Sequence, residues 1–174
     1  MNRLKIGLVI LAATAALAGC GSCGATPAAT PAIGDSCLVG TWTLQHEENK
    51  SGYSYAGTPV AVSGLAGAKL QLAADGSDTE VFDGSRPLVG VAPDGRTLSI
   101  SIAGSVKYSI RGDGHNYTET GGRVDLPTVA MIDGATIAGY QSYYTAGGGT
   151  YTCSSRSVTF TTSTGIQTDT WSKA

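Results

Sequence analysis

Few side chains in this 174-residue sequence have the types and spacing that catalysis requires. His46 and His115 are the only histidines, and neither has a second His or Cys at metal-binding spacing. His46 adjoins Glu47 and Glu48, which could form a weak divalent-cation site, although a solvated strand end is the simpler interpretation. Serine is abundant, but no Gly-x-Ser-x-Gly or Ser-x-x-Lys motif is present. We therefore expect no catalytic residue, no metal site and no cofactor, and a protein that is not an enzyme.

Tyrosine is the residue type best suited to ligand contact in this chain. The candidates form two groups in the sequence, which are Tyr53 with Tyr55, and Tyr140 with Tyr143 and Tyr144. A tyrosine combines a large apolar face with a polar tip, which is useful in a ligand pocket or at an interface. The same residues could instead fill the core of a domain that contains only two Phe. Both interpretations stay open, and the five tyrosines are our candidate ligand-binding residues.

The first twenty residues have the pattern of an export signal. Arg3 and Lys5 precede the apolar run Ile6–Leu17, which is shorter than the roughly 20 apolar residues of a transmembrane helix. The run ends in Leu17-Ala18-Gly19-Cys20, which resembles the lipobox of bacterial lipoproteins. That resemblance implies lipid on the Cys20 thiol, cleavage before Cys20, and anchoring on the extracytoplasmic face of the cell membrane. The alternative is an ordinary secreted protein with an accidental early cysteine.

Three segments follow from this pattern. We expect a signal peptide, helical in its apolar part, over residues 1–19, and the lipidated cysteine with a flexible tether over residues 20–36. Gly21–Ser36 is rich in Gly, Ala, Thr and Pro and has too little apolar bulk to pack. Residues 37–174 then form a single domain, which is long enough to bury its own core.

The remaining cysteines predict one disulfide. Cys20 is assigned to lipid and Cys23 lies in the expected tether, which leaves Cys37 and Cys153. Export places these thiols in an oxidising compartment, so a bond between Cys37 and Cys153 is the natural pairing. A bond from Cys23 to either partner is the alternative.

Residues 37–174 read as strands separated by turns. Apolar residues alternate with polar ones in several runs, as in Leu98, Ile100 and Ile102 and in Val158 and Phe160. Asp-Gly pairs, which suit tight hairpins, separate the runs at intervals of about ten residues. The fold class we predict is all-β, with an antiparallel up-and-down barrel of eight to ten strands following the signal helix and tether.

The two ends of the domain carry a family resemblance. Gly40-Thr41-Trp42 contains the Gly-x-Trp that opens the first strand of lipocalins and related calycin barrels. The domain also resembles lipocalin-like lipoproteins of high-GC Gram-positive bacteria, which open with Cys-Leu-x-Gly-Thr-Trp and close with a tail like Thr170-Trp171-Ser172-Lys173. In lipocalins the indole plugs the closed end of the barrel beneath a basic residue of the last strand. The resemblance thus implies that Gly40, Trp42, Trp171 and Lys173 close the barrel, although lipocalins usually have Arg where Lys173 stands.

Composition narrows the function further. The formal net charge of −2 gives no basic face for nucleic acid, and only 14% of residues are charged. We expect a monomer attached to the membrane by its lipid, with a barrel that binds a small hydrophobic or amphipathic ligand. The alternative is a lipoprotein with a filled barrel, of the inhibitor or stress-sensor type, whose outer surface contacts proteins of the envelope.

Overall fold

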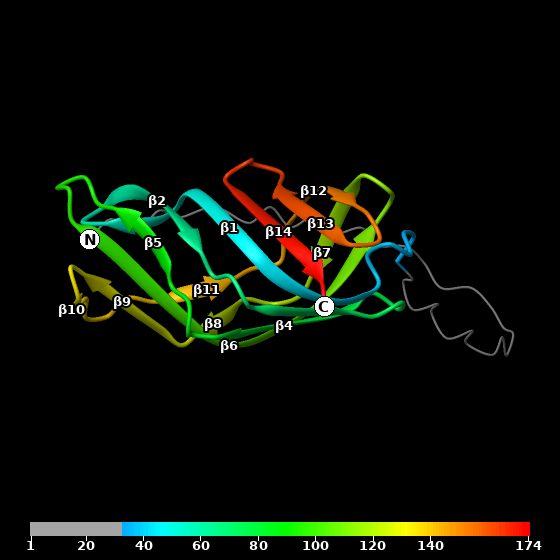
Figure 1. Ribbon diagram of the computed structural model, residues 1–174, viewed down its shortest axis with the longest axis horizontal. Helices are drawn as coiled ribbons and strands as arrows, with labels where there is room; N and C mark the ends of the chain where they lie inside the picture. Colours follow the sequence, from blue (N-terminus) through cyan, green and yellow to red (C-terminus); the bar gives the residue numbers. More distant parts are fainter. Residues whose placement is uncertain (1–32) are drawn as a thin grey trace, which may run out of the picture.

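The computed structural model describes residues 33–174, and these fold into antiparallel β-sheets without a helix (Figure 1). The predicted all-β class is therefore confirmed. Within residues 33–174 no helix is long and apolar enough to cross a membrane. The expected signal helix, Cys20 and most of the expected tether lie outside the described residues. Ile33 and Asp35, from the end of the expected tether, contact the domain: Ile33 is buried, and Asp35 accepts a hydrogen bond from Tyr151.

The described part of the chain contains fourteen strand segments, more than the eight to ten that we expected, because long strands are interrupted and short ones extend the sheet edges. In chain order they are β1 (Gly40–Tyr55), β2 (Thr58–Gly64), β3 (Lys69–Leu72), β4 (Ser77–Asp83), β5 (Leu88–Val91), β6 (Thr97–Gly112), β7 (Asn116–Thr120), β8 (Val124–Leu126), β9 (Thr128–Ile132), β10 (Ala135–Thr136), β11 (Ser142–Tyr144), β12 (Gly148–Cys153), β13 (Ser157–Thr162) and β14 (Gln167–Lys173).

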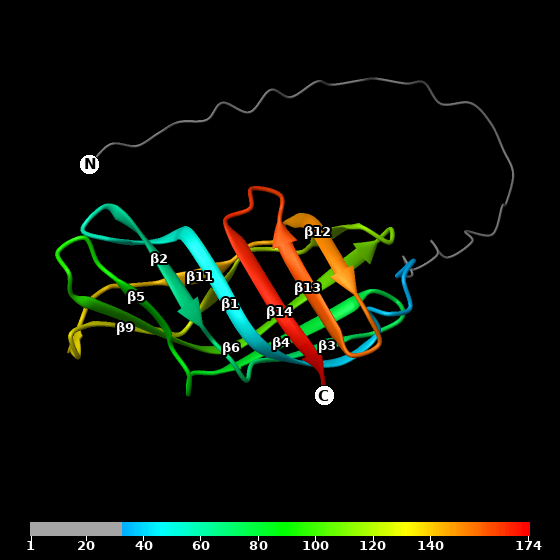
Figure 2. The same ribbon diagram turned by 45° about the horizontal axis from the view of Figure 1, so that its top comes forward.

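Four long antiparallel strands run the length of the molecule (Figure 2). The first is β1 and the fourth is β6, each of 16 residues and therefore roughly 50 Å long. The second consists of β2 continued by β3, and the third of β4 continued by β5. The chain makes a turn at residues 65–68 and a bend at residues 84–87, with positive φ at Leu65, Gly67 and Gly84.

At one end of these long strands, eight strands pair in series and the last one pairs with the first. The order β1–β3–β4–β6–β7–β12–β13–β14 follows the chain, every neighbouring pair is antiparallel, and β14 pairs with β1. We call this the eight-strand circuit and its end of the molecule the closed end. Hydrogen bonding of β14 to β1 leaves neither of these strands with an exposed edge along the paired residues.

The other end, the far end, is completed differently. There β2 pairs with β5, while β9 pairs with β6 and β10 with β9 (Figure 1). The two-stranded sheet of β8 and β11 crosses close to β6 at Gly104, where an added Cβ would lie 3.3 Å from the Leu126 side chain. The interior of the far end is apolar and buried, with Val60, Val62, Leu88, Leu98, Ile100, Ala130 and Ile132.

Candidate functional site

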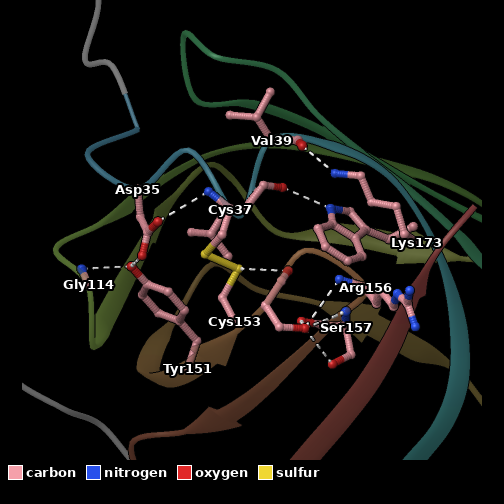
Figure 3. Close-up of a disulfide and its surroundings, with 12 residues drawn as sticks. Asp35, Cys37, Val39, Gly114, Tyr151, Cys153, Arg156, Ser157 and Lys173 are labelled. Carbon is pink, nitrogen blue, oxygen red and sulfur yellow. Dashed lines mark hydrogen bonds between the residues drawn. A yellow bond between two sulfur atoms is a disulfide. The ribbon is translucent and has the colours of Figure 1, made fainter.

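The disulfide between Cys37 and Cys153 is present, as predicted, and lies at the closed end (Figure 3). It joins residues 116 positions apart, with a Cα–Cα distance of 6.0 Å. Cys37 stands three residues before β1, and Cys153 is the last residue of β12. Tyr151 of β12 donates to Asp35 Oδ2 at 3.1 Å and accepts from the Gly114 amide at 2.7 Å. The segment before β1 is therefore held on β12 by both a covalent and a hydrogen-bonded connection.

The four residues expected to close the barrel lie together on β1 and β14. Trp42 pairs with Lys173, and Trp171 pairs with Leu44 two residues along β1. Both indoles are buried, and Trp42 Nε1 donates to the Leu38 carbonyl at 2.8 Å. Lys173 Nζ lies 4.2 Å from the centroid of the Trp42 ring and donates to the Val39 carbonyl at 2.6 Å.

Gly40 is required by this arrangement. Its φ is +143°, and a Cβ at this position would collide with Nζ of Lys173. A glycine therefore leaves room for the lysine to lie across the indole. The residues that the resemblance grouped are thus neighbours in the structure, and their role in closing the barrel stays a prediction.

A second cluster, of inward-facing carboxyl groups further along the same strands, was not predicted from the sequence. A bulge between Leu44 and His46 changes which residues of β1 face inward, from Trp42 and Leu44 to Glu47 and Asn49. Inward alternation on β4 buries Asp78 and Glu80 together with Phe82. The same alternation on β14 places Asp169 in phase with buried Trp171, and on β7 it places Glu119 in phase with Tyr117.

The result is a group of five carboxyl groups inside the closed end, which we call the acidic layer: Glu47, Asp78, Glu80, Glu119 and Asp169. Glu47 and Asp169 are direct cross-strand partners. Asp169 accepts hydrogen bonds from Gln167 Nε2 at 2.9 and 3.2 Å. Glu119 accepts from the Tyr144 hydroxyl and from the Gly147 amide, both at 3.1 Å.

The acidic layer lacks a positive partner among the described residues. The ion pairs of residues 33–174 are His46–Glu48, Arg96–Asp94 and Arg123–Asp125, all at the exposed surface. Burial, with added repulsion from Glu119, raises the pKa of Asp78 to about 7. Burial also raises the pKa values of Glu47, Glu80, Glu119 and Asp169 above their usual range, because a charged carboxylate loses its hydration there.

Two neighbouring cavities adjoin the acidic layer. The first has a volume of about 170 Å³, and its walls include Asp78, Glu80, Glu119 and Asp169. The second, of about 70 Å³, is bordered by Glu47 together with Glu80 and Asp169. Glu80, Tyr143, Tyr144, Gln167 and Asp169 line both cavities. None of the described residues that line them is a Lys, Arg or His.

Three buried polar atoms of the described residues have no hydrogen-bond partner, and all belong to residues that line these cavities. Asp78 Oδ1 and Trp171 Nε1 belong to the lining of the first cavity, and Ser142 Oγ to that of the second. A buried polar group without a partner typically costs about 1–3 kcal/mol. Three such atoms around one pair of cavities are expected where a ligand or ordered water completes the structure.

The predicted tyrosines divide between the cavities and the surface. Tyr143 and Tyr144 line both cavities, and Tyr53 lines the second. Tyr143 is 55% exposed and its ring lies 3.9 Å below the Arg123 guanidinium, whereas Tyr144 is partly buried against Tyr108. Tyr55 instead contacts Arg96, and Tyr140 packs against the core; neither lines either of these two cavities.

Residues 33–174 contain no group of three or more His, Cys, Asp or Glu side chains placed to hold a metal ion. Comparison of the chain with protein-family models, with curated proteins and with solved structures gives no match. The site must therefore be interpreted from its own chemistry.

Proposed function

We propose that this protein is an extracytoplasmic lipoprotein, anchored to the cell membrane through Cys20, whose eight-strand circuit is a lipocalin-like barrel that binds a small ligand. The anchor is supported by the Leu17–Cys20 motif. The barrel is supported by the chain-ordered antiparallel circuit, and by Lys173 lying across Trp42 where the lipocalin resemblance expects a cation over an indole.

The observation that carries the binding function is the cavity of about 170 Å³, two of whose lining residues, Asp78 and Trp171, each have a buried polar atom without a partner. An interior built only for stability is close-packed, and its polar groups are paired. A cavity of about 150 Å³ is large enough for benzene, so the ligand is a small molecule or one end of a larger one. Of the two ligand types expected from the sequence, an amphipathic molecule fits these walls better. A purely hydrophobic molecule would desolvate the carboxyl groups without offering them a polar partner.

The alternative role, a filled barrel that acts through its outer surface, agrees less well with two neighbouring cavities. Its support is a set of exposed valines on β4, β5 and β9, namely Val81, Val89, Val91 and Val129. Single exposed apolar residues are common on protein surfaces, so these side chains give weaker support than the cavity.

The test is native mass spectrometry of the full-length chain, purified from its own host in mild detergent. We expect an additional mass that corresponds to a small molecule. Thr162→Phe, which would fill the first cavity from β13, should abolish this mass, whereas Thr159→Phe, on the opposite face of the same strand, should retain it. Recovery of the same mass with both variants, or of none with the native chain, would contradict the proposal.

A further inference from the structure

We propose that the ligand of the first cavity is a small organic ammonium ion, held by the acidic layer and by the aromatic rings beside it. This inference rests on the proposed binding function and adds the chemical class of the ligand.

The charge of the cavity walls is the first argument. Asp78, Glu80, Glu119 and Asp169 are among the residues that line a volume of about 170 Å³, and no described Lys, Arg or His lines it. Each carboxyl comes from a strand and lies on the inward side of it; Asp78 and Glu80 are buried, and Glu119 and Asp169 are half-buried. Buried carboxylates are normally paired with a cation. A positively charged ligand would supply the partner that the described residues lack.

The unpartnered oxygen of Asp78 is the second argument, and it is independent of the charge count. The Asp78 side chain is only 8% exposed, it lines the first cavity, and its Oδ1 has no donor among the described residues. By contrast, Glu119 has two donors and Asp169 has one. An alkylammonium group carries up to three N–H donors, which suits an acceptor that is buried and free.

The aromatic lining favours an organic cation. Tyr117 and Phe160 meet edge to face with centroids 5.1 Å apart, and both line the first cavity with Tyr144 and Trp171. The faces of such rings attract ammonium groups and also accept the carbon skeleton attached to them. A bare metal ion gains nothing from apolar walls. Trp171, which also lines the first cavity, has a buried Nε1 without an acceptor among the described residues.

Burial of the carboxyl groups predicts a pH signature for this recognition. The free Asp78 carboxyl has a pKa of about 7, so it is partly protonated near neutral pH. An ammonium ion binds the ionised form and should therefore displace protons. The other titratable groups that line the first cavity are Glu80, Glu119, Asp169, Tyr117, Tyr143 and Tyr144, and none of them is basic. Affinity for an amine should thus increase from pH 5 to pH 8.

The experiment is a calorimetric titration of the full-length chain in nonionic detergent with probes of similar size. The probes are n-butylamine, 1,4-diaminobutane, tetramethylammonium, n-butanol, butanoate and calcium chloride. We expect the ammonium compounds to bind about tenfold or more tightly than n-butanol, and butanoate not to bind. Comparison of the primary amines with tetramethylammonium distinguishes hydrogen bonding at Asp78 from recognition by the rings alone. Titration in buffers of different ionisation enthalpy should show proton release.

Matched variants locate the site. Asp78→Asn and Glu80→Gln each remove one inward-facing charge from β4, and each should weaken n-butylamine binding about tenfold or more. Asp83→Asn, which changes an exposed residue at the end of the same strand, should leave the affinity unchanged. Circular dichroism would verify that every variant retains its β-sheet content.

The outcomes separate this inference from the proposed function. If n-butanol binds as tightly as n-butylamine, or if the molecule that co-purifies from the host is neutral or anionic, the ammonium inference fails while small-ligand binding stands. If calcium binds and Asp78→Asn abolishes that binding, the cavity is a metal site and the inference is overturned. If the native chain carries no ligand and no probe binds, both proposals fail.

Discussion

The closed end and the far end of the molecule are built from the same long strands, β1 and β6, but their interiors differ in chemistry. At the far end Val60, Leu88, Leu98, Ile100 and Ile132 are all buried in the hydrophobic core. At the closed end the same strands contribute to an interior that holds five carboxyl groups and the first cavity, while the second cavity extends to β8 and β11. The difference suits a far end that contributes stability and a closed end that loses packing and hydration energy, as the binding site proposed above would require.

The largest loss of stability should come from truncating a buried side chain at the far end. Ile100 is fully buried on β6, and Ile100→Ala should lower the free energy of unfolding by about 2–5 kcal/mol. Amine affinity at the closed end should be retained under conditions where the variant is folded. Ser101→Ala, on the other face of β6, provides the control and should change stability by about 0.5 kcal/mol or less. Equal effects of the two substitutions would contradict the assignment of the far end as the stabilising core.

Removal of the disulfide should weaken the closed end in particular. The Cys37→Ser/Cys153→Ser double variant should lose about 2–4 kcal/mol, because the bond closes a long loop in the unfolded chain. Amide hydrogen exchange should show the greatest loss of protection in β12 and β13. Loss of protection concentrated in β5 and β9 would show that the two ends are not separable in this way.

The acidic layer should make stability depend on pH in the opposite sense from ordinary surface carboxylates. Below about pH 4 the Asp78 carboxyl is protonated in both folded and unfolded chains. As the pH rises, the unfolded chain ionises first, whereas the folded one resists ionisation up to its pKa of about 7. Stability of the ligand-free protein should therefore fall between pH 4 and pH 8. Asp78→Asn should recover about 1–3 kcal/mol at pH 8 and none at pH 4.

Thermal unfolding across this pH range provides the measurement. Asp83→Asn is again the control, since hydrogen bonds from Ser85 lower the pKa of this exposed carboxyl. A native protein whose melting temperature rises steadily from pH 4 to pH 8 would contradict the prediction.

The smallest effect should come from the lysine over Trp42. Lys173→Met keeps most of the aliphatic stem but removes the charge and the hydrogen bond to Val39, and should cost about 1 kcal/mol. Trp fluorescence should change with it, because the ammonium lies against the indole. Lys107→Met, at an exposed position of β6, should change neither property.

Regular alternation explains why part of this structure could be predicted from the sequence. Leu98, Ile100, Ile102, Val106, Tyr108 and Ile110 alternate with polar residues, and all six are buried along β6. The pairing of Cys37 with Cys153 was also predicted, because assigning Cys20 to lipid and Cys23 to the tether leaves these two. These features depend on local periodicity and on the few cysteines in the domain.

The acidic layer could not be predicted in the same way, because an isolated carboxylate in a strand is normally taken to face water. Glu47 would face outward if β1 were regular, and only the bulge after Leu44 turns it inward. Asp169 and Glu80 did give a signal: each lies two residues from a large aromatic side chain, Trp171 and Phe82 respectively, on the same face of its strand. Position in phase with a buried aromatic residue is therefore a better guide to burial than residue type alone.

The link between Cys37 and Cys153 also determines how the domain would bear a mechanical load. A pull on the amino-terminal part of the chain first loads the contacts of Ile33 and Asp35 with the domain and then reaches Cys37, three positions before β1 begins. Without the bond, such a pull could peel β1 away from β14 and β3 one hydrogen bond after another. With it, the covalent connection transfers part of the tension to β12, on the other side of β14 and β13, so that several strands must yield together. The domain is thus braced at the point where the amino-terminal part of the chain enters it.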